Sequence, residues 1–286
     1  MPELPEVEAL ARFVAEKAAG TTVERAEIAS LSALKTYRPP LDALVGRVVA
    51  GAGRRGKYLC IEVGELWLVT HLARAGWLHW RDPVPLARAR PGKGPLALRV
   101  GLSSGAGFDL TEQGTEKRLA LWLVEDPATI EGVARLGPDP LSPSFEQAQL
   151  ADVLSRAPGQ LKTVLADQSV LAGVGNAYSD EVLWAAKLSP FKAAGKLTDA
   201  ELGRLYSALT GTLRSAVERS LGQAAKELKD AKRAGMGVHG REGQACPVCG
   251  TPVRSVFLAN RSFQYCPECQ TGGKVLADRR LSRLLK

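Results

Sequence analysis

Four cysteines near the end of the 286-residue chain have the spacing of a metal site. Cys246 and Cys249 form one Cys-x2-Cys pair, and Cys266 and Cys269 form a second pair after sixteen intervening residues. Two such pairs can supply four thiolates to one tetrahedral zinc ion. The alternative, two disulfides, is rare in intracellular proteins. Because four cysteines leave no open coordination position, the sequence predicts a structural zinc ion and places the chemistry elsewhere.

The N-terminus offers a nucleophile of a different kind. Removal of Met1 would leave Pro2 with a free secondary amine, which forms a charged iminium with an aldehyde. An α-amino group has an ordinary pKa of about 8 and is partly neutral at physiological pH. Glu3, Glu6 and Glu8 follow at the start of a predicted helix, whose dipole favours negative charge. A chance Met-Pro start is the alternative, and the acidic cluster favours a catalytic amine.

A short glycine turn could bind a phosphate. The run Gly173-Val174-Gly175-Asn176 lies between two predicted helices, so its backbone amides and the Asn176 side chain could converge on an anion at a helix N-terminus. A plain turn between helices would have the same sequence, so the motif alone leaves both interpretations open.

The first 130 residues, which must position the N-terminal groups, have mainly a β pattern. Apolar residues at helical spacing predict one amphipathic helix from Leu4 to Ala18, with Pro5 in its first turn and Gly20 after its end. Short β-branched and aromatic runs separated by turn residues then predict a β-sandwich. The expected strands are 22–28, 58–63, 66–71, 96–102 and 119–124.

The rest of the chain has a helical period. Glycines and prolines in residues 131–144 predict a linker, and helices are expected at 148–156, 161–168, 177–187 and 200–220. We therefore predict an α+β protein. Its expected parts are a sandwich domain (1–130), the linker (131–144), a helical domain (145–240), a β-hairpin zinc finger (241–270) and a basic C-terminal extension (271–286).

The net charge of +8 and a pI of about 9.4 favour a polyanionic partner. The excess is uneven, because residues 241–286 contain eight Lys or Arg and three acidic residues. That distribution favours nucleic acid over simple solubility, without separating DNA from RNA. No apolar stretch is long enough for a membrane span and no secretory pattern is present, so a cytoplasmic protein without membrane contact is expected.

Four segments, in order along the chain, resemble one known family. Residues 1–8 (Met-Pro-Glu-Leu-Pro-Glu-Val-Glu) resemble the start of the formamidopyrimidine-DNA glycosylase and endonuclease VIII family. Residues 54–59 are similar to its catalytic-lysine hairpin, and residues 167–181 are similar to its helix-two-turns-helix motif. Residues 239–270 resemble its zinc finger.

The resemblance implies a monomeric base-excision-repair enzyme that binds damaged double-stranded DNA and extrudes the lesion. Pro2 would attack the anomeric carbon and form a Schiff base, and the strand would be nicked by β,δ-elimination. Glu3 would shuttle a proton, Glu6 would orient the first turn, and Lys57 would contact the lesion phosphate and assist cleavage. Backbone phosphates would be held by a further group of residues, namely Asn176, Arg261 and Lys162.

Two segments depart from the branch of the family that removes oxidised purines. Residues 71–76 lack the methionine that fills the hole left by the extruded base, and residues 111–118 lack the accompanying Arg and Phe. Arg74 could fill the stack with its planar guanidinium, or form a surface ion pair. Residues 222–238 are short and Lys-rich where a lid over the flipped base is expected. We therefore expect weak discrimination among bases and prominent action on abasic DNA.

Two rival functions remain open from sequence. One is a damaged-DNA or abasic-site binding protein with weak or no catalysis. The other is a zinc-ribbon adaptor of the transcription or translation apparatus, which explains the charge and the cysteines but leaves the acidic N-terminal helix unexplained.

Overall fold

The computed structural model describes residues 1–92, 94–258 and 261–277, and for residues 258 and 261 it describes the backbone alone. The chain forms two compact units, each built from two stretches of sequence. The first unit comprises Met1–Arg135 and Ser220–Lys229, and the second comprises Leu136–Arg219 and Asp230–Lys286.

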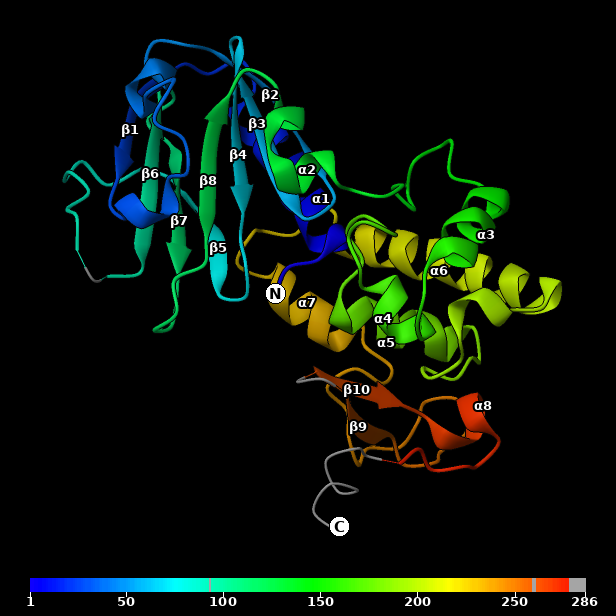
Figure 1. Ribbon diagram of the computed structural model, residues 1–286. Helices are drawn as coiled ribbons and strands as arrows, with labels where there is room; N and C mark the ends of the chain where they lie inside the picture. Colours follow the sequence, from blue (N-terminus) through cyan, green and yellow to red (C-terminus); the bar gives the residue numbers. More distant parts are fainter. Residues whose placement is uncertain (93, 259–260, 278–286) are drawn as a thin grey trace. The chain divides into compact units, whose positions relative to one another are not determined.

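The first unit contains the predicted β-sandwich, made of two antiparallel four-stranded sheets (Figure 1). One sheet has the order β1-β6-β7-β5 and the other has the order β2-β3-β4-β8. The strands are β1 (Val23–Ile28), β2 (Val49–Arg55), β3 (Tyr58–Val63), β4 (Leu66–His71), β5 (Gly76–Arg81), β6 (Leu96–Leu102), β7 (Gly107–Glu112) and β8 (Ala120–Val124). Apolar side chains from both sheets enter one continuous core.

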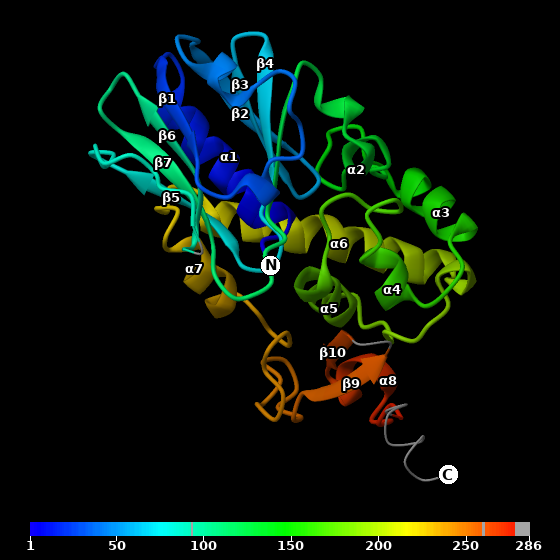
Figure 2. The ribbon, with the colours of Figure 1, turned by 60° about the vertical axis from the view of Figure 1, so that its left-hand side comes forward.

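Helix α1 (Leu4–Ala18) completes this core (Figure 2). It packs on β2 and β3, and its apolar stripe of Leu4, Val7, Leu10 and Val14 has no exposed surface. Full burial of side chains of this size contributes about 1.5–3 kcal/mol each. The predicted helix is therefore confirmed with its predicted bounds, and its burial fixes the start of the chain.

All five expected strands are present within one residue of their expected bounds, but β2, β5 and β7 were not predicted. Strand β2 contains Gly51 and Gly53 in place of β-branched residues, and it is formed by pairing with β3 and by the cover of α1. All six residues of β7 are buried, so it lacks the alternation of a half-exposed strand. One of them, Asp109, accepts hydrogen bonds from Arg81 and Arg99 at 2.7–3.0 Å.

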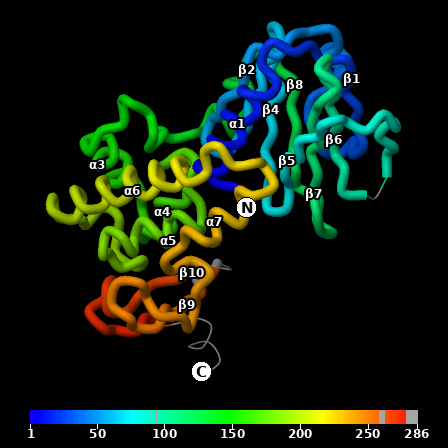
Figure 3. Tube along the Cα trace, turned by 180° about the vertical axis from the view of Figure 1, so that it is seen from behind, coloured from blue at the N-terminus to red at the C-terminus, as the bar shows by residue number. Residues whose placement is uncertain are grey.

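The second unit contains the expected helices and the expected hairpin. Its main helices are α3 (Gln147–Arg156), α4 (Leu161–Leu165), α5 (Asn176–Ala185) and α6 (Asp199–Ser220). The hairpin strands β9 (Arg254–Leu258) and β10 (Arg261–Tyr265) precede a short helix, α8 (Pro267–Thr271). The hairpin lies beside α5 (Figure 3). Among the described helices, none has the length and apolar character that crossing a bilayer requires.

Residues 220–229 correct the expected limits of the helical domain, because they pack in the first unit. Ala225 and Leu228 are part of the sandwich core, and Trp77 Nε1 donates a hydrogen bond of 2.8 Å to the Ala225 carbonyl oxygen. The expected 145–240 domain is therefore interrupted. Helix α7 (Leu228–Ala234) follows, within the segment that was expected only to be short and Lys-rich.

The expected linker also contains local structure. A short helix, α2 (Glu131–Ala134), occupies its first residues, and the boundary between the two units falls after Arg135. An expected linker of fourteen residues is thus divided between the two units.

The position of Leu228 gives a stability prediction. Leu228→Ala would leave a cavity in the sandwich core, and we expect the free energy of unfolding to fall by about 2–5 kcal/mol. Leu221→Ala is the matched control, because Leu221 is 38% exposed and its loss should cost no more than about 0.5 kcal/mol. Urea denaturation of the full chain measures both, and equal losses would contradict the packing of residues 220–229.

Candidate functional site

The start of α1 is closed by its own acidic residues. Glu3 is the N-cap, and its backbone N–H donates to Glu6 Oε2 at 2.8 Å in a capping box. Glu3 is 3% exposed and Glu6 is 1% exposed, whereas Met1 is 49% exposed. Pro2 is buried directly before this cap. While Met1 remains attached, the nitrogen of Pro2 is an amide, so only removal of Met1 produces an amine here.

Lys57 lies in the turn between β2 and β3. Gly56 has φ of 55°, a left-handed conformation that glycine adopts at little cost, and Lys57 beside it is 6% exposed. The hairpin is tied to α1, because Arg54 Nε lies 2.9 Å from Glu8 Oε2. Glu8 also accepts a hydrogen bond of 2.8 Å from Arg12. The N-terminal carboxylates and Lys57 are thus carried by elements that pack directly on each other.

The structure adds His71 to this region, a residue to which the sequence assigned no catalytic role. It ends β4 and pairs in register with Tyr58, and the two rings have centroids 5.0 Å apart. Burial and the positive charge of Lys57 both lower the pKa of His71. The imidazole is therefore neutral near pH 7 and lies within the electrostatic reach of Lys57. From the sequence, the position of His71 beside Tyr58 could be found only through the strand register, and the register can be assigned only when the paired strands are known.

Arg74 lies exposed on the tight turn between β4 and β5. Ala73 before it has φ of 52°, an uncommon conformation for a residue with a side chain. Gly76 closes the turn with a hydrogen bond of 2.9 Å to the Leu72 carbonyl, and a Cβ on Gly76 would lie 2.1 Å from that oxygen. Among the described residues, Arg74 has no ion-pair partner, so it is not held in a surface salt bridge.

A second loop is joined to this turn. The Gln113 N–H donates to the Ala75 carbonyl at 3.2 Å. The buried carboxylate of Glu112 accepts hydrogen bonds from the backbone of Arg118 and Leu119 at 2.8–3.0 Å. Residues 113–118 are exposed and contain no aromatic side chain, so this loop presents only polar groups.

In the second unit, Gln168 shapes the glycine turn at the start of α5. Its Oε1 accepts from the Gly173 N–H at 2.9 Å and its Nε2 donates to the Val174 carbonyl at 2.7 Å. Asn176 begins α5, and its Nδ2 donates to the carbonyl of Ser262 in β10 at 3.0 Å. Its Oδ1 is buried without a partner among the described residues. Asn176 therefore joins the helix start to the hairpin.

The expectation that Lys162 contacts a DNA phosphate does not fit its position. The side chain is 1% exposed, and its Nζ donates to Asp180 Oδ1 at 2.5 Å, to the Asn176 carbonyl at 2.6 Å and to Ser179 Oγ at 2.9 Å. A buried ammonium ion that is paired inside the protein has neither the exposure nor the free donors that a phosphate contact needs. Lys162 is a structural residue.

The side chain of Arg261 lies outside the described residues, although its backbone begins β10. Residues 278–286 of the expected basic extension also lie outside the described part of the chain. The phosphate-binding role expected for Arg261 therefore stays a prediction.

The four cysteines come together as predicted. One ligand atom from each of Cys246, Cys249, Cys266 and Cys269 lies within 4.8 Å of the other three. Three of the sulfur–sulfur distances are 3.3, 3.5 and 3.9 Å. A tetrahedron with zinc–sulfur bonds of about 2.3 Å has sulfur–sulfur edges of roughly 3.8 Å. Burial raises the pKa of Cys266 and Cys269, so a cation at the centre is what would keep these thiols ionised.

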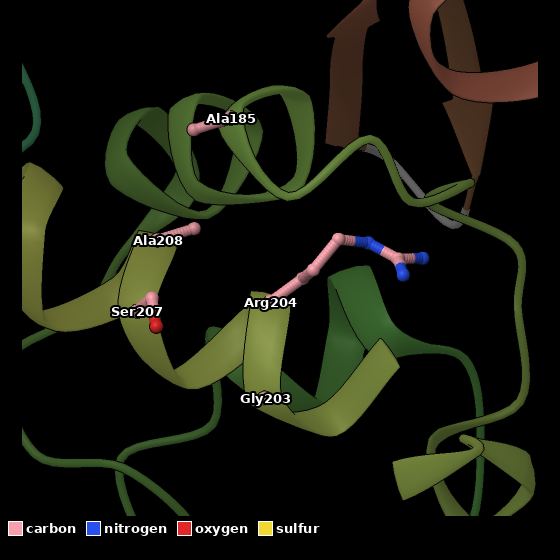
Figure 4. Close-up of a pocket in the computed structure, with 5 residues that line it drawn as sticks. All are labelled: Ala185, Gly203, Arg204, Ser207 and Ala208. Atoms are coloured by element: carbon pink, nitrogen blue, oxygen red, sulfur yellow. The ribbon is translucent and has the colours of Figure 1, made fainter. Parts of the chain in front are cut away.

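A surface hollow in the second unit lies outside all of these groups (Figure 4). It is lined by Ala185, Gly203, Arg204, Ser207 and Ala208. One guanidinium and one hydroxyl offer no carboxylate, thiol or amine for the predicted chemistry, so the hollow is not a candidate active site.

The burial of Lys162 gives a second prediction. Lys162→Met removes one partner of a buried ion pair, and we expect the free energy of unfolding to fall by about 3–5 kcal/mol. Lys192→Met is the control, because its ion pair with Glu201 is more exposed, at 29% and 18% of the two side chains, and should contribute at most about 1 kcal/mol. Thermal unfolding compares the two variants. If Lys162→Met lowers the free energy of unfolding no more than the control does, the burial of the Lys162–Asp180 ion pair is contradicted.

Comparison with known proteins agrees with this arrangement. The formamidopyrimidine-DNA glycosylase N-terminal domain matches residues 1–115, and the formamidopyrimidine-DNA glycosylase H2TH domain matches residues 136–227. An uncharacterized formamidopyrimidine-DNA glycosylase-like protein of Mycobacterium tuberculosis is 58% identical over 53% of this chain and 94% of its own length. The formamidopyrimidine-DNA glycosylase of Symbiobacterium thermophilum is 35% identical over 98% of this chain and 93% of its own.

A solved structure extends the likeness to three dimensions. The complex of Lactococcus lactis Fpg with DNA that contains an abasic site has a TM-score of 0.80 and 25% identity, and it covers 94% of this chain and 99% of the other. The full-length match, the two family domains and the shared fold lead to one conclusion. The chain belongs to the formamidopyrimidine-DNA glycosylase family.

Proposed function

We propose that this protein is a bifunctional DNA glycosylase and abasic-site lyase of base excision repair, with Pro2 as its nucleophile. The observation that supports this most is the start of α1, where Pro2 is buried directly before the Glu3–Glu6 capping box. A chain terminus normally frays, but this one is held by a buried helix. Such an amine has the fixed position that nucleophilic attack requires.

In the proposed reaction the lone pair of the Pro2 amine forms a bond to the anomeric carbon of the damaged nucleotide. The bond to the base breaks, and the base leaves with its electron pair and takes up a proton. The deoxyribose ring opens with a proton transfer through Glu3, which gives a charged iminium. Loss of the C2′ proton then forms a double bond and expels the 3′ phosphate, and loss of the C4′ proton likewise expels the 5′ phosphate, each phosphate departing with its electron pair. One displacement is thereby split into easier steps.

The other first-unit residues position these atoms. Glu6 holds the first turn, because its carboxylate accepts the Glu3 N–H at 2.8 Å. Lys57 is carried by a hairpin that the Arg54–Glu8 ion pair ties to α1, and it would contact the lesion phosphate and assist cleavage. The neutral imidazole of His71 beside Lys57 adds no charge that competes for that phosphate.

Damaged double-stranded DNA is the proposed partner, and a cytoplasmic monomer the proposed form. Asn176 at the start of α5 would bind a backbone phosphate with the amides of its turn, and Arg261 would bind another. The four cysteines would hold one structural Zn²⁺ that fixes the hairpin beside α5. Arg74 is exposed and has no ion-pair partner among the described residues. It would fill the gap that the extruded base leaves in the base stack of the DNA.

We also propose weak discrimination among damaged bases, with prominent lyase action on abasic sites. Residues 113–118 present no aromatic wedge. The segment after α6 is anchored in the sandwich core through Leu228 and the Trp77–Ala225 hydrogen bond, so it does not form a free lid. An active site that makes few contacts with the extruded base would discriminate little between one damaged base and another. Strong and exclusive excision of 8-oxoguanine opposite cytosine in a panel of lesions would contradict this proposal.

One observation supports a second candidate function. Before Met1 is removed, Pro2 has no amine and is buried. The unprocessed chain would therefore be a damaged-DNA binding protein without catalysis, whereas the processed chain would be the enzyme.

A borohydride trap tests the chemistry. We expect the Met1-processed protein to form a covalent adduct with abasic duplex DNA in the presence of borohydride, because only an iminium is reduced to a stable amine. Pro2→Gly should reduce the yield of adduct at least tenfold. A tenfold loss of rate corresponds to an activation barrier that is higher by about 1.4 kcal/mol. Denaturing gels measure the adduct.

The control for this trap is Pro5→Ala, which changes a proline in the same helix and should keep the adduct. If wild-type protein that binds the duplex gives no adduct, the lyase proposal is wrong and the binding function remains.

Zinc content provides an independent prediction. Purified protein should contain one zinc per chain, and Cys266→Ser should lose it because three thiolates remain. Cys60→Ser should retain the zinc, since Cys60 lies in β3 of the other unit. Atomic absorption measures the content, and equal zinc in both variants would rule out the four-cysteine site.

A further inference from the structure

The backbone on the two sides of Lys57 is restrained differently. Gly56 before it has φ of 55° and lies in the turn between β2 and β3, where glycine keeps wide conformational freedom. Tyr58 after it begins β3 and pairs in register with both Arg55 and His71. The backbone position of Lys57 is therefore set from the strand side, by Tyr58.

The ring of Tyr58 packs against two aromatic neighbours on its own sheet. Its centroid lies 5.0 Å from that of His71 on β4 and 5.8 Å from that of Trp122 on β8. The next residue, Leu59, enters the sandwich core, so Tyr58 faces away from that core because side chains alternate along a strand. Rotation of the ring would break its contact with His71 or Trp122. The ring is therefore held in one orientation.

The far end of this ring meets helix α2. A Cβ added to Gly132 would lie 2.2 Å from Tyr58 Oη and 3.3 Å from Tyr58 Cζ, and real Cβ atoms essentially never come closer than 3.0 Å to another heavy atom. Gly132 does not have a positive φ, so the backbone itself would accept another residue. Glycine is required at position 132 because the Tyr58 hydroxyl occupies the space of a side chain.

Helix α2 lies at the point where the chain leaves the first unit. It ends at Ala134, and the first stretch of that unit ends at Arg135. A close-packed contact transmits a displacement because no empty space absorbs it. A shift of α2 toward the sheet would therefore push the Tyr58 ring, and with it the backbone next to Lys57.

We propose that Tyr58 is a positioning residue for Lys57, and that its contact with Gly132 makes the position of Lys57 depend on α2. One end of the ring is attached to the backbone beside Lys57, and the other end lies against the helix. Movement of α2 against the ring would change where the ammonium group lies relative to the lesion phosphate. The inference rests on the proposed function, in which Lys57 contacts that phosphate.

The test measures binding to a duplex with a tetrahydrofuran abasic-site analogue, which cannot form an iminium, across a range of salt concentrations. Gly132→Ala should weaken binding at least tenfold, the effect of one lost hydrogen bond to a charged group. The slope of log affinity against log salt should become shallower by about 0.9, because one phosphate fewer is neutralised. Lys57→Met should cause the same two changes. The double variant should bind no more weakly than either single variant, since both changes act on one contact.

A second substitution at Tyr58 should rescue Gly132→Ala. Tyr58→Phe removes the hydroxyl and leaves Cζ at 3.3 Å, which needs a shift of only a few tenths of an ångström, so the pair should bind as wild type does. Tyr58→Phe alone should also bind normally, because Tyr58 Oη makes no hydrogen bond among the described residues. A purely structural loss elsewhere in the protein would not be rescued in this way.

Two further variants complete the design. Gly211→Ala is the matched control, because Gly211 also lies in a helix but has nothing within 4 Å of an added Cβ, and it should bind as wild type. Tyr58→Leu removes the ring with Gly132 intact, and it should reproduce the weaker binding and the shallower slope. It carries the test if Gly132→Ala does not fold. Thermal unfolding verifies that each variant is folded.

Three results would overturn the inference while the proposed function stands. They are normal binding by folded Gly132→Ala or Tyr58→Leu, a loss that Tyr58→Phe does not rescue, and additive losses when Gly132→Ala is combined with Lys57→Met. Absence of binding by the wild-type protein, or normal binding by Lys57→Met, would refute the proposed function at this contact, and this inference with it.

Discussion

The proposed chemistry depends on one constraint, which is that the first residues of the chain must not move. A catalytic amine at a terminus has one covalent attachment, and chain ends fray unless they are packed. Here the apolar stripe of α1 enters the sandwich core, and Glu3 and Glu6 close the first turn before it. The Arg54–Glu8 contact then ties the lysine hairpin to the same helix. Hydrophobic burial of α1 stabilises its packing on the sandwich, and the two polar contacts fix the position of the first residues. The sandwich therefore supports its own N-terminus.

The second unit uses charge differently. Among its described residues the most buried cation is Lys162, which pairs with Asp180 and joins α4 to α5 inside the protein. The carboxylates of α5 are also used internally, Glu181 for the loop before the cysteines and Asp180 for Lys162 and His239. The overall positive charge of the chain is therefore a poor guide to which cations reach a phosphate. Burial and pairing decide that, residue by residue.

Local sequence patterns predicted the elements whose signal lies within one segment. The helix Leu4–Ala18, five strands and the cysteine cluster agree with the structure, because periodicity and ligand spacing are properties of neighbouring residues. Strand β2 has glycines where β-branched residues would mark a strand, and β7 is buried along its whole length, so neither shows the alternation of a half-exposed strand. Lys162 was misassigned because the fate of a lysine depends on whether a carboxylate such as Asp180 meets it in the fold. The role of His71 likewise depended on register with Tyr58.

The return of residues 220–229 to the sandwich has a consequence for how the protein is made. Ala225 and Leu228 enter the core of a unit whose other residues end at Arg135. During translation, the ribosome must therefore synthesise about eighty further residues, from 136 to 219, before the last side chains of that core emerge. The complete core of the first unit is therefore not encoded by one contiguous stretch of the chain. That core is completed only after most of the helices have been synthesised, so the support that holds Pro2 is finished only when residues 136–219 have been made as well.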